Sequence, residues 1–140
     1  MGVRHHRDLE VWKLCNQIRG RMLELTDRVA VRSDFTFRNQ TRDAAGSACR
    51  NTAEGFWRFG HPEFAHFVNI AKASLGELMD SVDEALQKRY IDDREYRDLN
   101  ELLEHALAAA TSLYAHLHST PTPRRPRNPD RPSVPPRTKR

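Results

Sequence analysis

The chain has 140 residues, with 23 Lys or Arg and 19 Asp or Glu, which gives a formal net charge of +4 at pH 7. This length is typical of one domain, since domains commonly run about 100–150 residues. No apolar run approaches the roughly 20 residues that a membrane-spanning helix needs, and the N-terminus lacks the apolar stretch of a secretion signal. We therefore predict a cytoplasmic protein with no membrane partner.

The last twenty residues have a different composition from the rest. Residues 121–140 contain seven of the eight prolines, seven Lys or Arg and one acid, Asp130. Such a segment cannot bury enough apolar surface to offset the entropy lost on ordering. We predict a folded domain over residues 1–120, with a net charge of about −2, and a disordered basic tail over residues 121–140. A basic tail attracts polyanions such as nucleic acid, although solubility is a competing explanation for its charge.

Apolar residues recur at spacings of three and four in four segments, which is typical of helices with one buried face. In residues 8–30 the pattern begins after Asp8, a plausible N-cap or first-turn acid, and comprises Val11, Cys15, Ile18, Met22, Leu25 and Val29. In residues 35–57 the inward positions are mostly small, namely Phe37, Thr41, Ala44, Ala48, Thr52 and Gly55. This second helix is therefore expected to pack closely against its neighbours, with Arg42 and Arg50 pointing away from that face.

The third and fourth helices follow the same pattern. Gly60 suits a helix exit and Pro62 the first turn of a helix over residues 62–88. Asp92 and Glu95 form a D-x-x-E capping box for a helix that ends near His118. The predicted fold class is all-α, an antiparallel up-down four-helix bundle. Its apolar stripes are broad enough that subunit contacts and a thick core with a few exposed leucines are both open.

No catalytic or metal-binding set stands out. Glu63 and His66 form one E-x-x-H pair, but di-iron bundles need a second copy, which is absent from the sequence. The remaining histidines are expected to be solvated or to cap helices. Cys15 and Cys49 lie within apolar patterns without C-x-x-C spacing, so we expect buried thiols. We predict no catalytic residues, no metal and no cofactor.

The sequence between the second and third predicted helices has more residues that could bind a ligand. Phe56, Trp57, Arg58 and Phe59 interleave aromatic rings with a cation, a combination that can stack on bases and neutralise phosphate. These rings can instead simply close the end of the bundle, with Arg58 capping the carbonyls of the second helix. Asn51 and Glu54, near the same helix end, can bind loop backbone or a neighbouring subunit.

Several motifs together resemble one family. They are Arg7-Asp8-Leu9-x-Val11-Trp12, Gln40-x-Arg42-x-Ala44-Ala45-x-Ser47, Asn51-x-Ala53-Glu54-Gly55-Phe56-x-Arg58, Glu63-Phe64-x-x-Phe67, and Ile70-Ala71-x-Ala73-Ser74-Leu75-x-Glu77-Leu78. In this order and spacing the chain is similar, over about residues 7–117, to the four-helix-bundle proteins named after 23S rRNA intervening sequences.

The resemblance implies a small bacterial bundle, often a homopentamer, without an established enzymatic activity. The predicted bundle is also similar in fold to accessory proteins of diversity-generating retroelements, which bind nucleic acid and a reverse transcriptase. The structural or assembly motif would comprise Asn51, Glu54, Gly55, Phe56, Ser74 and Glu77. One departure weakens a nucleic-acid role: Asp43 stands where the family usually has a second arginine after Arg42.

From these observations we expect a non-enzymatic, self-associating scaffold that associates with nucleic acid, either rRNA or another RNA or DNA. The expected nucleic-acid contacts are Arg42, Arg50, Trp57, Arg58, Arg124, Arg125 and Arg127. A nucleic-acid-processing protein is a further expected partner. The alternative is a protein-protein interaction or assembly module whose positive charge is incidental.

Overall fold

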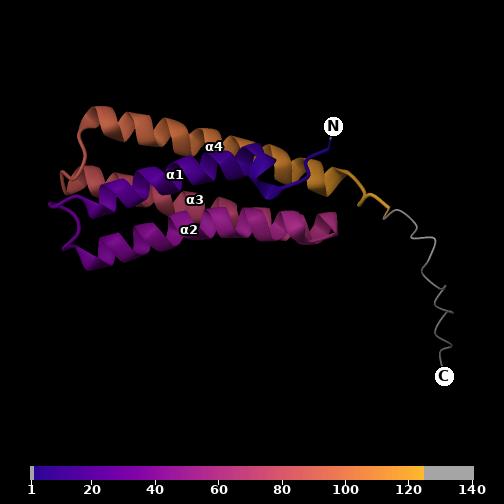
Figure 1. The fold of residues 1–140 in the computed structure, drawn as a ribbon. Helices are drawn as coiled ribbons and strands as arrows, with labels where there is room; N and C mark the ends of the chain where they lie inside the picture. The colour runs from indigo at the N-terminus through magenta and orange to yellow at the C-terminus, as the bar shows by residue number, and fades with distance from the viewer. Residues whose placement is uncertain (1, 125–140) are drawn as a thin grey trace, which may run out of the picture.

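A computed structural model describes residues 2–124 and has four long antiparallel helices (Figure 1). They are α1 (Glu10–Asp27), α2 (Phe35–Trp57), α3 (His61–Gln87) and α4 (Asp93–Ser119), preceded by the 3-10 turn η1 (His6–Asp8). The all-α four-helix bundle is confirmed, and no strand occurs within the described residues. None of the helices in this part of the chain is long and apolar enough to span a membrane.

The first helix is shorter at both ends than its apolar pattern predicts. Asp8 does not cap α1, because its carboxylate accepts a hydrogen bond from the His5 backbone N–H at 3.2 Å and closes η1 instead. At the other end α1 stops at Asp27, where Arg28 takes an extended conformation. Val29 therefore leaves the buried stripe and is 77% exposed, while Val31 turns back and is fully buried.

Small residues let α2 approach α3 closely, as the sequence predicts. All six predicted inward positions of α2 are buried. At its C-terminal end, a Cβ added to Gly55 would lie 2.8 Å from Phe67 Cβ and 3.2 Å from the backbone oxygen of Phe64. Since real Cβ atoms do not approach other atoms this closely, the helices touch at Gly55 only because this residue has no side chain.

The core is a continuous set of buried side chains from all four helices, including Phe37, Ile18, Met22, Leu75, Leu78 and Leu103. Of the apolar residues that flank the main stripe, Leu14 is buried, and Leu86, Leu102 and Leu107 are partly buried. Leu23 is 44% exposed. A thick core, one of the two alternatives that the sequence left open, thus takes up part of the broad stripe, and subunit contacts stay a prediction. Cys15 and Cys49 are free thiols within this core, as predicted, and burial raises the pKa of Cys15 to about 12.

Charged side chains hold together the bundle end that carries the α1–α2 and α3–α4 loops. Arg28 bridges Glu95 of α4 at 2.6 Å and Glu24 of α1 at 2.9 Å. Asp34 caps α2 and accepts hydrogen bonds from Lys88 and Tyr90, both at 2.7 Å. The Lys88 ammonium and the Tyr90 hydroxyl lower the pKa of Asp34 to about 2. These contacts fix the loops on the side opposite the two chain ends.

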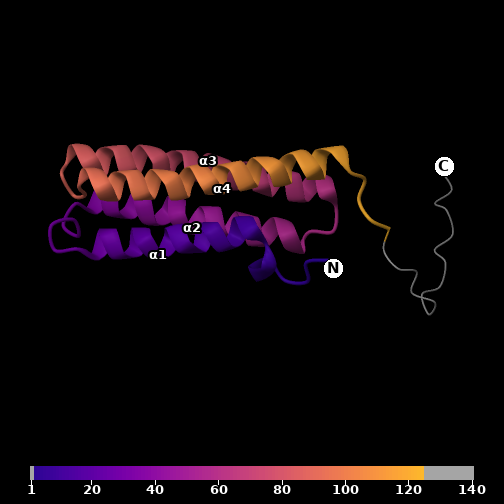
Figure 2. The ribbon, with the colours of Figure 1, turned by 90° about the horizontal axis from the view of Figure 1, so that it is seen from above.

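The N-terminal turn, the α2–α3 corner and the end of α4 lie together at the other end of the bundle, as both views show (Figures 1 and 2). The connection between α2 and α3 is short, and Gly60 is the N-cap of α3 with φ −84°. Gly60, expected at a helix exit, thus begins α3 instead of ending α2, because α2 already ends at Trp57 with an extended Arg58. We call this end, with residues 2–12, 54–67 and 113–124, the corner end.

Candidate nucleic-acid interface

Trp57 and Arg58 stand at the C-terminus of α2, on the surface of the corner end. The Trp57 side chain is 60% exposed, and its ring packs edge-on against Phe56 with centroids 4.9 Å apart. Arg58 pairs with Glu54 one turn earlier at 2.7 Å, and its guanidinium carbon lies 5.2 Å from the centre of the Phe67 ring. Exposed ion pairs of this kind contribute little to stability and exchange readily. The Arg58 charge thus remains available to an outside anion.

The N-terminal turn contacts Trp57, which the sequence did not predict. The Trp57 indole Nε1 donates a hydrogen bond to His6 Nδ1 at 3.0 Å. The His6 ring also packs against Trp12 of α1 and His5 of the same turn, with centroid distances of 5.2 and 4.3 Å. His5 caps η1 by accepting from the Arg7 backbone N–H. The Trp57 N–H is thus already bonded to His6, although the residue as a whole is 60% exposed.

We expect the hydrogen bond between Trp57 and His6 to break on acidification. Partial burial, followed by the nearby His5 and Arg7, lowers the pKa of His6, while Asp8 opposes the shift. Because a depressed pKa means that the docked ring resists protonation, the hydrogen bond is fully present above about pH 6.5 and disappears as pH falls through the lowered pKa. The indole N–H resonance of Trp57 should therefore stay constant above about pH 6.5 and shift as the pH is lowered further. A flat resonance, or the same titration in His6→Gln, would contradict this expectation.

The segment after α4 is held against the start of α3. The backbone N–H of His61 donates to Thr122 Oγ1 at 2.9 Å, and His61 Nδ1 lies 3.0 Å from the Thr120 carbonyl oxygen. Arg124 is exposed and follows Thr122 by two residues. The start of the basic segment thus lies against His61, the first residue of α3. Arg125 and Arg127 lie outside the described residues, as does most of the predicted tail.

A shallow groove of about 400 Å³ lies beside Arg58 and is lined also by Pro62, Glu63, His66 and Phe67. Glu63 and His66 are both exposed on the outer side of α3. Within residues 2–124, no three His, Cys, Asp or Glu side chains are placed to hold a metal ion. The groove instead offers an aromatic ring with a guanidinium over it.

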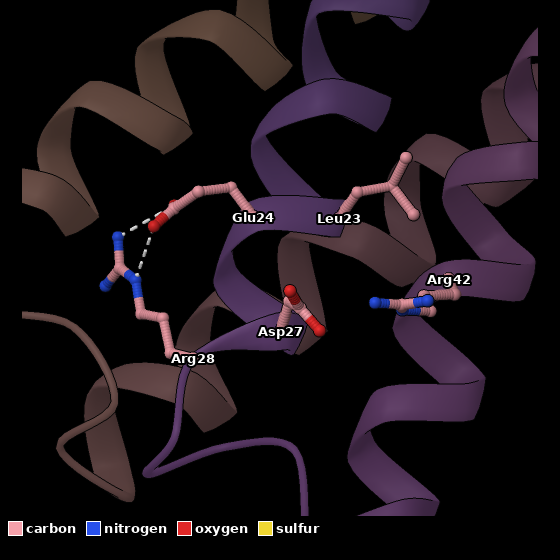
Figure 3. A pocket seen from close by; sticks show the side chains of 5 residues that line it. All are labelled: Leu23, Glu24, Asp27, Arg28 and Arg42. Atoms are coloured by element: carbon pink, nitrogen blue, oxygen red, sulfur yellow. Dashed lines mark hydrogen bonds and ion pairs between the residues drawn. The ribbon is translucent and has the colours of Figure 1, made fainter.

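Arg42 lies far from the corner end and is less available than the sequence predicts. It is partly buried, and its Nε donates to the fully buried Thr26 Oγ1 of α1 at 2.8 Å. Figure 3 shows it reaching from α2 toward α1, in a shallow groove lined also by Leu23, Glu24, Asp27 and Arg28. The negative charges of Glu24 and Asp27 balance the positive charges of the two arginines in this groove. We expected Arg42 to point away from the inward face of α2, but its side chain reaches across to α1, where Thr26 accepts its hydrogen bond.

Arg50 is exposed near the middle of α2, and its side chain folds over Gly46. A Cβ added to Gly46 would meet only the end of the Arg50 side chain, which can move. The structure therefore places Trp57, Arg58 and Arg124 at the corner end and leaves Arg42 and Arg50 outside it. The role of each in nucleic-acid binding stays a prediction.

Most of the predicted structural motif lies at the α2–α3 interface. Ser74 Oγ donates to Ser47 Oγ at 2.8 Å, and Asn51 Nδ2 donates to Ser47 Oγ and to the Ser47 carbonyl, both at 2.9 Å. Phe56 is partly buried and contacts Phe64 edge-on, with centroids 6.3 Å apart. Glu54 and Glu77 are exposed. Asn51, Gly55, Phe56 and Ser74 thus have packing roles within one chain.

Sequence reasoning missed His6, His61 and Phe67 as members of the corner end. Six of the seven histidines, all except His105, belong to this end. His6 and His61 contact residues more than 50 positions away, Trp57 and Thr122, so no local spacing indicates these contacts. The only signal was compositional: histidines gather in the segments that begin or end the predicted helices.

A comparison with protein families matches residues 7–112 to the model described as 23S rRNA-intervening sequence protein. A search of curated proteins gave no match. The family description names an rRNA insertion and no reaction. The matched range includes all of α1, α2 and α3 and most of α4, together with the Trp57–Arg58 corner. Since this range exceeds half of the chain, the protein belongs to the 23S rRNA-intervening sequence protein family.

Proposed function

We propose that this protein is a non-enzymatic scaffold that binds RNA through its corner end. The observation that carries the proposal is the convergence of Trp57, Arg58 and the start of the basic segment at one end of the bundle. The family description supports an association with rRNA. Positive charge beside exposed aromatic rings suits a polyanion with accessible bases.

The distribution of charge also favours the corner end as the RNA-binding surface. Residues 1–120 carry a net charge of about −2, so the body as a whole does not attract phosphate. Residues 121–140 carry seven Lys or Arg and one acid, and they begin beside the corner. A locally concentrated charge of this kind raises the concentration of a polyanion near the surface next to it.

The proposal predicts a salt-dependent affinity that depends on the tail. Fluorescence anisotropy with an rRNA fragment should show binding at about 50 mM salt that weakens strongly toward about 200 mM. In the full-length chain, changing the tail cations and Arg58 to Gln should lower the slope of log K against log salt. The expected decrease is about 0.7 for each phosphate of a single strand that the variant no longer neutralises. The tail cations are Arg124, Arg125, Arg127, Arg131, Arg137, Lys139 and Arg140.

The matched control is Arg94→Gln with Arg97→Gln, two exposed arginines at the start of α4, at the opposite end of the bundle. These changes should leave both affinity and salt slope almost unaltered. No binding at low salt, or an unchanged slope in the tail variant, would refute the proposed RNA-binding function.

Self-association is the second part of the proposal. The family resemblance implies a homopentamer, and Leu23, Val29 and Phe35 are exposed apolar side chains that a second copy could cover. Light scattering at micromolar concentration should give a mass above that of the 16.2 kDa chain. A monomer would refute self-association. A stable oligomer without RNA affinity would favour the alternative, a protein-protein assembly module.

A further inference from the structure

We propose that the corner end selects single strands: the exposed face of Trp57 and the groove between Arg58 and Phe67 receive unpaired nucleotides. This inference rests on the proposed function and adds the class of nucleic acid to it. It is carried by two aromatic residues near one arginine: Trp57, exposed and next to Arg58 in the chain, and Phe67, whose ring lies under the Arg58 guanidinium.

Trp57 has the properties of a stacking platform. Its side chain is 60% exposed at the end of a rigid helix. Its single hydrogen-bond donor, Nε1, is already bonded to His6 Nδ1, and the rings of Phe56 and His5 pack nearly perpendicular to the indole, with centroids 4.9 and 5.3 Å away. What remains for a ligand is the exposed part of the ring, and any base can stack on an aromatic ring without hydrogen-bond readout. Contact with Trp57 should therefore depend little on base identity.

The groove beside Arg58 suits a second nucleotide. Phe67 contributes a ring to its lining, with the Arg58 guanidinium over that ring, while Pro62, Glu63 and His66 complete the wall. Its volume, about 400 Å³, lies within the usual range for small-ligand sites. Arg58 can pair with a phosphate or stack on a base, because its own ion pair with Glu54 is half exposed.

A duplex would leave these surfaces unused. Bases in an A-form helix are stacked on one another, and its major groove is too narrow for side chains to read. Duplex binding would rely on the basic charges alone, whereas a single strand can use the charges and the rings together. The difference in affinity between single strand and duplex thus measures what the aromatic rings contribute to binding.

The test compares an unstructured uridine dodecamer with a duplex that presents the same number of phosphates, both bound to the full-length protein at low salt. We expect the single strand to bind at least tenfold more tightly. Trp57→Leu should weaken single-strand binding at least fivefold and leave duplex binding unchanged, since a stacked base contributes about that much or more. Trp57→Phe, which retains a ring, should recover most of the affinity.

The matched control is Phe35→Leu, which removes another exposed ring, 68% accessible, at the opposite end of the bundle. It should change neither affinity, and circular dichroism should show that each variant melts like the wild type. Equal affinity for single strand and duplex, or equal weakening of both in Trp57→Leu, would overturn this inference while leaving the RNA-binding function in place. Absence of binding to either probe would overturn both.

Discussion

Gly55→Ala should lower the free energy of unfolding by about 1–2 kcal/mol, although alanine is the better helix former. The added Cβ would lie 2.8 Å from Phe67 Cβ, an atom next to the backbone, and 3.2 Å from the Phe64 carbonyl oxygen. Neither atom can move without shifting α3. Overpacking of this kind typically costs about 1–3 kcal/mol, and the gain in helix propensity offsets up to about 1 kcal/mol of that. Urea unfolding followed by circular dichroism measures the difference.

Gly46→Ala is the matched control, because it makes the same chemical change at another position of the same helix. There the new Cβ would meet the Arg50 guanidinium, which is the mobile end of an exposed side chain. We expect this variant to be neutral or more stable by up to about 1 kcal/mol. If the two variants have equal stability, the close approach of α2 and α3 at Gly55 does not limit the side chain at that position.

Ser47→Ala should destabilise the bundle by about 1–2 kcal/mol. Ser47 Oγ accepts hydrogen bonds from Ser74 of α3 and from Asn51 one turn later in α2. Its removal leaves the Ser74 hydroxyl, which is 5% exposed, without this acceptor, and an unsatisfied buried group costs about 1–3 kcal/mol. Urea unfolding of the single variants and the double variant with Ser74→Ala gives the coupling between the two side chains.

The double variant should be less destabilised than the sum of the two single variants, by about 0.5–1 kcal/mol, because both partners of the bond are then absent. Ser112→Ala is the control for the higher helix propensity of alanine, since Ser112 is exposed within α4. Additive effects would mean that the hydrogen bond between Ser47 and Ser74 contributes nothing measurable.

The helix periodicity was sufficient to predict the fold because each helix buries one continuous stripe. The inward positions of α2 were right in every case, and α2 begins and ends where the pattern does. The errors lie at helix ends. Asp8 looked like a cap for α1 but closes a separate turn with His5, and Val29 continued the apolar spacing beyond a helix that ends at Asp27. Helix ends depend on local side-chain contacts, which periodicity does not encode.

The candidate site was only partly predictable. Trp57 and Arg58 were recognised because they are adjacent in the sequence. The contacts of His6 with Trp57 and of His61 with Thr122 join residues more than 50 positions apart, and only the folded bundle brings them together. Arg42 was predicted as a site residue but lies away from the corner end. Helical projection places it on the surface, whereas a hydrogen bond to the buried Thr26 on the neighbouring helix holds its side chain against the bundle.

The location of the nucleic-acid interface is tested most directly by ultraviolet crosslinking of full-length protein to a single-stranded rRNA fragment, followed by identification of the crosslinked peptides by mass spectrometry. The corner end should supply the crosslinks, chiefly at Trp57 and Phe59, both exposed aromatic residues, and in the peptides that follow Thr122. Crosslinks confined to the opposite end of the bundle, around Phe35 and Arg42, would contradict an interface at the corner end.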